Sequence, residues 1–235
     1  DLGQLSDASV ASSGPLTLQG MALSTNLGRN FALGSDINAS KTANASDWGS
    51  AAGFTSIGTV AGAFTGTFAG LGHTVNDLTI NRPGIADIGL IGAAIGNSVI
   101  RDVGLVRGSV TGGAGTGGLL GSNTTGSVSN SYNTANITGG AGTGGLVGSN
   151  TTGSISNSYS TGNVSGGAGT GGLIGASTTG NISNSYATGS VTGGAGTGGL
   201  IGANTPGNLS NSYPTGVVTG GAGTGGVMGA NTNGN

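Results

Sequence analysis

The sequence contains no cysteine and little charge, and each shortage excludes a class of protein. Without cysteine there is neither a disulfide framework nor a cysteine-ligated metal site. Charge is limited to five Lys or Arg and seven Asp residues, and none of it lies beyond Arg107. Five scattered cations cannot form the basic stripe with which nucleic-acid-binding proteins displace counterions from phosphates. We therefore expect no nucleic-acid partner.

Proline and long apolar runs are also scarce. Only four prolines are present and glycine does not fall at every third position, so the chain is not collagen. No apolar run approaches the roughly 20 residues that a membrane-spanning helix needs. The first residues, Asp1 to Gln4, do not resemble a signal peptide. We expect any export signal to have been removed or to lie outside this sequence.

Glycine is abundant instead, at 56 of 235 residues, and it follows a strict repeat. The segment Gly-Gly-Ala-Gly-Thr-Gly-Gly begins at Gly112, Gly139, Gly166, Gly193 and Gly220, so each step is 27 residues without insertion or deletion. A fixed period in this range predicts a solenoid, a propeller or another repeat array. A propeller blade needs about 40 residues, which favours a solenoid. With a net charge of -2 and many β-branched residues, disorder is not expected.

One repeat, residues 139–165, predicts three short strands separated by glycine-containing corners. The first is the apolar stretch 145–148, and the third is 163–165. Between them, residues 154–159 alternate with period 2, which predicts a strand with Ile155, Asn157 and Tyr159 on one face. Helices are not expected, because caps and a 3.6-residue period are missing. The fold class is therefore all-β, a parallel β-helix with three short strands per 27-residue coil.

Stacking the coils in register places identical positions above one another, about 4.8 Å apart. The aliphatic columns are predicted to form the core, and an inward Asn column is predicted to pair its amides along the stack. The direction of the Tyr column stays open. The aliphatic columns are Leu119, Leu146, Leu173 and Leu200; Val128, Ile155, Ile182 and Leu209; and Val110, Ile137, Val164, Val191 and Val218. The Asn column is Asn130, Asn157, Asn184 and Asn211, and the Tyr column is Tyr132, Tyr159, Tyr186 and Tyr213.

The rest of the chain carries similar elements without the strict repeat. We interpret 1–83 as irregular β-helix coils with a projecting loop over 35–53, and 84–111 as one degenerate coil. Residues 112–235 are then the array of four full repeats and a partial fifth. The first 107 residues hold all the charge, the only His and the only Trp, so conventional polar chemistry is confined to this half.

Several segments resemble a known family. Gly-Gly-Leu-Val-Gly-Ser-Asn from Gly144, followed by residues 153–159, resembles the GLUG motif. Residues 30–37 and 64–74 are similar to the segment that commonly precedes GLUG repeats. Proteins with this motif include filamentous-haemagglutinin-like exoproteins exported by two-partner secretion. The resemblance implies a right-handed β-helix, export and a place at the cell surface, and it implies no particular ligand.

Catalysis is considered because pectinase-like enzymes share this architecture. Those enzymes use clustered carboxylates, often with Lys or Arg, to bind a cation or to pair an acid with a base. The repeats contain none of these residues. The charged residues of the N-terminal half are interpreted as solvated charges or local ion pairs. We expect no enzyme, no cofactor and no metal site. The only candidates for such a cluster are His73, Asp77, Arg82, Asp87, Arg101 and Asp102.

Serine rows in the repeats predict a flat, uncharged outer face. A neutral solvated face, weak multivalent binding of carbohydrate or another surface, and ice binding stay open, although paired Thr-x-Thr rows for ice are missing. Glycosylation at Asn-x-Ser/Thr sequons also stays open. The rows are Ser127, Ser129 and Ser131; Ser154, Ser156 and Ser158; and Asn181, Ser183 and Ser185. The sequons begin at Asn38, Asn44, Asn123, Asn136, Asn150, Asn163, Asn181 and Asn208.

Together these features predict a non-catalytic stalk or adhesin segment, secreted and associated with the cell surface. The alternative is a filament subunit. The sequence stops at Asn235, midway through a coil and without a recognisable cap. An open parallel edge is a template for pairing, so further coils of the same chain or other copies are the expected partners at the ends. Glycans and host or abiotic surfaces are the other expected partners.

Overall fold

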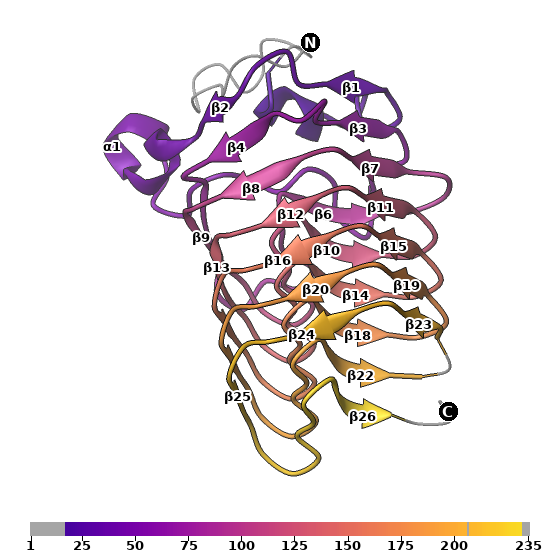
Figure 1. Ribbon diagram of the computed structural model, residues 1–235. Helices are drawn as coiled ribbons and strands as arrows, with labels where there is room; N and C mark the ends of the chain where they lie inside the picture. The colour runs from indigo at the N-terminus through magenta and orange to yellow at the C-terminus, as the bar shows by residue number, and fades with distance from the viewer. Residues whose placement is uncertain (1–16, 206, 232–235) are drawn as a thin grey trace.

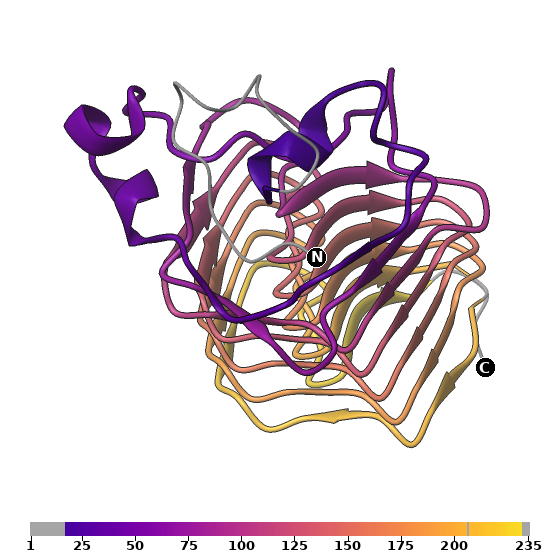
Figure 2. The same ribbon diagram turned by 90° about the horizontal axis from the view of Figure 1, so that it is seen from above.

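The computed structural model describes residues 17–205 and 207–231, and this part of the chain forms a parallel β-solenoid of about six turns. Figure 1 shows the coils stacked from the N-terminal to the C-terminal end, and seen along the stack they follow a common outline (Figure 2). The prediction of an all-β parallel solenoid with three strands per coil is confirmed. Residues 1–16 of the predicted N-terminal unit lie outside the described residues.

The strands form four parallel sheets, numbered here 1 to 4. Sheet 1 contains β1 Phe31–Ala32, β3 Thr67–Ala69, β7 Val99–Arg101, β11 Ser127–Ser129, β15 Ser154–Ser156, β19 Asn181–Ser183 and β23 Leu209–Ser210. Sheet 2 contains β2 Ile37–Asn38, β4 Thr74–Asn76, β8 Gly104–Val106, β12 Tyr132–Asn133, β16 Tyr159–Ser160, β20 Tyr186–Ala187 and β24 Tyr213–Pro214. Sheet 3 contains β5 Thr79–Asn81, β9 Ser109–Thr111, β13 Asn136–Thr138, β17 Val164–Ser165, β21 Val191–Thr192 and β25 Val218–Thr219. Sheet 4 contains β6 Ile91–Ala94, β10 Leu120–Asn123, β14 Val147–Asn150, β18 Ile174–Ser177, β22 Ile201–Asn204 and β26 Met228–Asn231.

Successive coils pair in the register that the repeat dictates. Ile155 of β15 pairs with Ile182 of β19, and Val164 of β17 pairs with Val191 of β21. Side chains at the same repeat position therefore lie directly above one another. The predicted aliphatic columns are buried along the stack, except that Leu209 and Val218 in the last coil are half-buried. A further buried column in sheet 4, which was not predicted, is formed by Leu120, Val147, Ile174 and Ile201.

The middle strand of each coil is bent, which corrects two predictions about its faces. Asn157 has a φ of 50°, in the left-handed region that Asn tolerates better than most residues. This bend divides the strand into β15 and β16 and breaks the period-2 alternation. The Asn column (Asn130, Asn157, Asn184, Asn211) consequently faces solvent rather than the core. The third serine of each predicted outward row (Ser131, Ser158, Ser185) is instead buried.

Glycine is required where the corners approach sheet 4. Gly142 has a φ of 66°, which favours glycine. At Gly148, a Cβ atom would overlap the main chain of Gly115 in the Gly-rich corner of an adjacent coil. The buried Thr143 closes its own corner by donating from Oγ1 to the carbonyl oxygen of Gly140 at 2.7 Å. The repeated Gly-Gly-Ala-Gly-Thr run is thus a packing element of the solenoid.

The N-terminal coils carry the only helical segments of the described chain. They are η1 Gln19–Ala22, η2 Ser40–Ala43 and α1 Ala45–Trp48. The last two fall in the predicted projecting loop 35–53, where α1 stands out from the side of the solenoid (Figure 1). Trp48 at its end is buried, stacks on Phe54 at 6.2 Å between ring centroids, and anchors the projection.

Candidate functional site

The charged residues that sequence analysis singled out lie mostly in separate pairs. Arg107 donates from Nε and Nη2 to the two carboxylate oxygens of Asp77, both at 2.8 Å, and these hydrogen bonds hold the pKa of Asp77 below its usual value. His73 Nδ1 lies 3.3 Å from Asp36 Oδ1. The backbone N–H of Thr74 also donates to Asp36, and this bond is the main cause of that carboxyl's lowered pKa.

Asp87 and Asp102 do not form a shared carboxylate site. Asp102 accepts from Asn130 Nδ2 at 3.0 Å and from Arg101 Nη1 at 2.7 Å, and these bonds, that of Asn130 above all, lower its pKa. Asp87 lies at a corner before sheet 4, where burial raises its pKa. Among residues 17–205 and 207–231, no group of three or more His, Cys, Asp or Glu side chains could hold a metal ion.

Arg82 is the remaining candidate, and it binds neutral groups. Its Nη2 donates to Thr55 Oγ1 at 2.9 Å and its Nε to the carbonyl oxygen of Phe54 at 3.4 Å. It lines a hollow of about 320 Å³ together with Trp48 and Gln19. The candidates therefore form separate local contacts, and the structure does not bring them together into one cluster.

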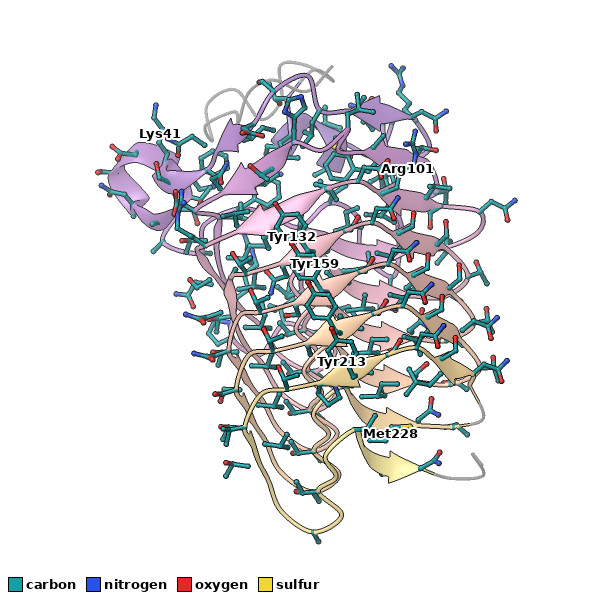
Figure 3. All side chains as sticks on the ribbon, in the orientation of Figure 1. Lys41, Arg101, Tyr132, Tyr159, Tyr213 and Met228 are labelled. Carbon is teal, nitrogen blue, oxygen red and sulfur yellow. The ribbon has the colours of Figure 1, made fainter. Side chains whose placement is uncertain are left out.

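The Tyr column lies on the outside of sheet 2 and forms a continuous stack (Figure 3). Ring centroids are 4.8 Å apart from Tyr132 to Tyr159 and from Tyr159 to Tyr186, and 5.6 Å apart at Tyr213. The interplanar angles are 6°, 4° and 12°, so the inner rings cover one another's faces. Only the ring edges and hydroxyl groups of the inner tyrosines are offered to solvent. This question, which the sequence left open, is settled in favour of an outward stack.

A buried polar column, which was not predicted, lies where the strands of sheet 4 end. Asn123 and Asn150 are fully buried, and Nδ2 of Asn123 donates to Oδ1 of Asn150 at 2.8 Å. Each amide also donates to a backbone carbonyl three residues later, Gly126 and Gly153 respectively. Asn123 and Asn150 both begin sequons, and their burial makes them inaccessible to glycosylation. The exposed sequon residues are Asn38, Asn44, Asn136, Asn163, Asn181 and Asn208.

These faces and columns define a class of protein, a parallel β-solenoid of 27-residue coils. The family profile described as "The GLUG motif" matches residues 139–165 and 166–192, which confirms the GLUG resemblance for two coils. Halomucin of Haloquadratum walsbyi is 41% identical over 104 residues, which are 44% of this chain and 1% of halomucin. These matches do not bear on the resemblance to filamentous-haemagglutinin-like exoproteins, which stays a prediction.

Two solved structures share the fold. A Bacteroides ovatus protein described as a candidate immunoglobulin A1 protease superposes with a TM-score of 0.68 and 26% identity, over 86% of this chain and 65% of that one. A second structure, named IgA1 Protease, gives a TM-score of 0.57 and 23% identity over 92% of this chain and 20% of that chain. This chain thus spans only part of each relative. Within the described residues, no helix is long and apolar enough to cross a membrane.

Proposed function

We propose that this chain is a non-catalytic structural segment of a secreted, surface-associated stalk or adhesin. The observation that carries the proposal is the unbroken pairing from coil to coil, with Val128, Ile155 and Ile182 in one buried column of sheet 1. A coil stabilised by its neighbours can be repeated without changing the outer faces. The GLUG match and the similarity to halomucin support a repetitive β-helix protein of this kind.

The proposal predicts that length scales with the number of coils. Inserting two further copies of residues 139–165 should lengthen the particle by about 9.6 Å, twice the strand spacing of about 4.8 Å. Small-angle X-ray scattering of the two chains measures this difference. A chain that keeps the same maximum dimension after insertion contradicts a stalk. Particles that lengthen with protein concentration would instead favour the end-to-end filament.

The enzyme alternative is tested directly, because both solved structures carry the name of an immunoglobulin A1 protease. Incubation of this chain with human immunoglobulin A1, followed by gel electrophoresis, should leave the heavy chain intact. Cleavage that copurifies with the chain would refute the non-catalytic proposal. Antibody labelling of intact producing cells tests the surface location: a signal that external protease abolishes is expected, and a signal seen only after lysis contradicts it.

A further inference from the structure

Two outward columns of neutral polar side chains run along sheet 3, on either side of a buried aliphatic column. They arise because Ile137, Val164 and Val191 face the core, which turns the residues before and after each of them outward. One column is Thr79, Ser109, Asn136, Asn163 and Ser190, and the other is Asn81, Thr111, Thr138, Ser165 and Thr192. A hollow of about 370 Å³ lies along the last three of these coils, residues 136–138, 163–165 and 190–192.

The side chains of this groove keep unused hydrogen-bonding capacity. Oδ1 of Asn136 accepts from the backbone N–H of Asn163 at 3.2 Å, and Oδ1 of Asn163 accepts from the N–H of Ser190 at 3.1 Å. These bonds fix the amides in the same orientation in successive coils. Within the described chain, neither Nδ2 group has a protein acceptor. The hydroxyl groups of Ser165 and Thr138 are likewise exposed and without a protein partner.

The chemistry of the groove selects a neutral occupant. No charged side chain follows Arg107 in the sequence, so a polyanion finds no counter-charge along the three coils that line the hollow. The groove also contains no aromatic side chain. What it offers is a set of amide and hydroxyl groups repeated once per coil, at the strand spacing of about 4.8 Å. That repeat is close to the length of one sugar unit in an extended β-linked glycan.

We propose that this groove binds a neutral, extended polysaccharide parallel to the solenoid axis, with about one sugar unit per coil. The two columns stand two residues apart along each strand, about 7 Å, so a sugar ring between them contacts both. Each coil contributes only a few exposed hydrogen bonds, so affinity depends on engaging several coils at once. The inference does not rest on the structural role proposed above, because a stalk needs no glycan to keep its length.

Isothermal titration calorimetry with defined oligosaccharides tests the inference. The probes are cellohexaose and chitohexaose, their disaccharides, and hexagalacturonate as a polyanion of equal length. At least one neutral hexamer should bind ten times or more tighter than its disaccharide and tighter than hexagalacturonate. Absence of binding by both neutral hexamers, or equal affinity for a hexamer and its disaccharide, would overturn the inference.

A matched pair of variants locates the binding. Ser165→Tyr fills the groove from its second column, whereas Thr161→Tyr adds the same ring at an exposed position outside it. Ser165→Tyr should weaken hexamer binding at least tenfold and Thr161→Tyr should leave it unchanged, with circular dichroism verifying that both fold. The double variant Asn136→Ala, Asn163→Ala removes the two free amide donors and should weaken binding without adding bulk. Unchanged affinity in the Ser165 and double variants would place binding elsewhere and refute the groove.

Discussion

Nδ2 of Asn123 donates to Oδ1 of Asn150 at 2.8 Å, between residues one coil apart whose side chains are both fully buried. Because the same amide also donates to the carbonyl oxygen of Gly126, Asn123 joins its own corner to the next coil. Inside the stack, this amide pair adds a polar link between successive coils to the packing of the aliphatic columns.

Replacing Asn150 with Leu should lower the free energy of unfolding by about 1 to 3 kcal/mol. The substitution removes the acceptor of Asn123, and an unsatisfied buried polar group costs about 1 to 3 kcal/mol. Asn163→Leu is the matched control, because the backbone N–H of Ser190, which loses its acceptor, is at an exposed residue and can bond to water instead. Chemical denaturation measures both variants, and equal losses would show that the buried column contributes nothing particular.

Ile155→Asp should destabilise the solenoid far more than Ser156→Asp. Ile155 is fully buried in sheet 1, where an unpaired carboxylate is costly, whereas Ser156 is partly exposed. We expect a loss of at least about 3 kcal/mol for the first variant and about 1 kcal/mol or less for the second. Comparable melting temperatures for the two variants would contradict the assigned strand faces.

Asn157→Val should cost about 1 to 2 kcal/mol, because a β-branched residue resists the left-handed conformation found here. Asn157→Gly should change stability by less than about 0.5 kcal/mol, since glycine adopts this φ freely. The comparison isolates backbone strain, because Asn157 makes no side-chain hydrogen bond in the described chain. If Gly and Val are equally destabilising in thermal melts, the corner does not require the left-handed residue.

The Tyr stack should make stability depend on alkaline pH. Burial, followed by the neighbouring Tyr132 and Tyr186, raises the pKa of Tyr159 above its ordinary value. An unfolded chain then releases this proton at lower pH than the folded chain does. The contribution is complete below the ordinary tyrosine pKa of about 10 and is lost as pH rises through the raised pKa. Tyr159→Phe should reduce this alkaline loss of stability. Denaturation of both chains at pH values on either side of the ordinary tyrosine pKa of about 10 measures the loss, and tyrosinate absorbance follows the titration. If the free energy of unfolding depends on pH equally in both chains, the raised pKa of Tyr159 does not contribute to stability.

The period and the aliphatic positions allow the sheets and the Ile155 column to be predicted from sequence, because one register satisfies every coil. The face of Asn157 was wrong because alternation was carried across a residue type that often turns the chain to the left-handed region. The burial of Asn150 was not predicted, although an Asn three residues before a glycine can close a corner by hydrogen bonding. The pairing of Asp77 with Arg107 had a usable signal, since opposite charges about one coil apart fall side by side. The groove on sheet 3 had no such signal in the sequence, because it depends on which exposed hydroxyl groups lack hydrogen-bond partners in the fold.

Ser177→Asn should stabilise the chain by about 1 kcal/mol, the net value of a typical intramolecular hydrogen bond. Ser177 occupies the coil between Asn150 and Asn204, and it interrupts the buried amide column. Its hydroxyl and Oδ1 of Asn204 are both buried without a hydrogen-bond partner. In the orientation of Asn123 and Asn150, an Asn at position 177 would accept from Asn150 and donate to the free oxygen of Asn204.

Ser177→Val is the control for this substitution, because it removes the unpaired hydroxyl and fills similar space without donating to Asn204. Denaturation by urea should rank the chains with Ser177→Asn above both the native chain and Ser177→Val. Asn is larger than Ser, so a cavity too small for it would give the opposite order. In that case the interruption at Ser177 would reflect packing in this coil, and the amide column would be limited by volume rather than by hydrogen bonding.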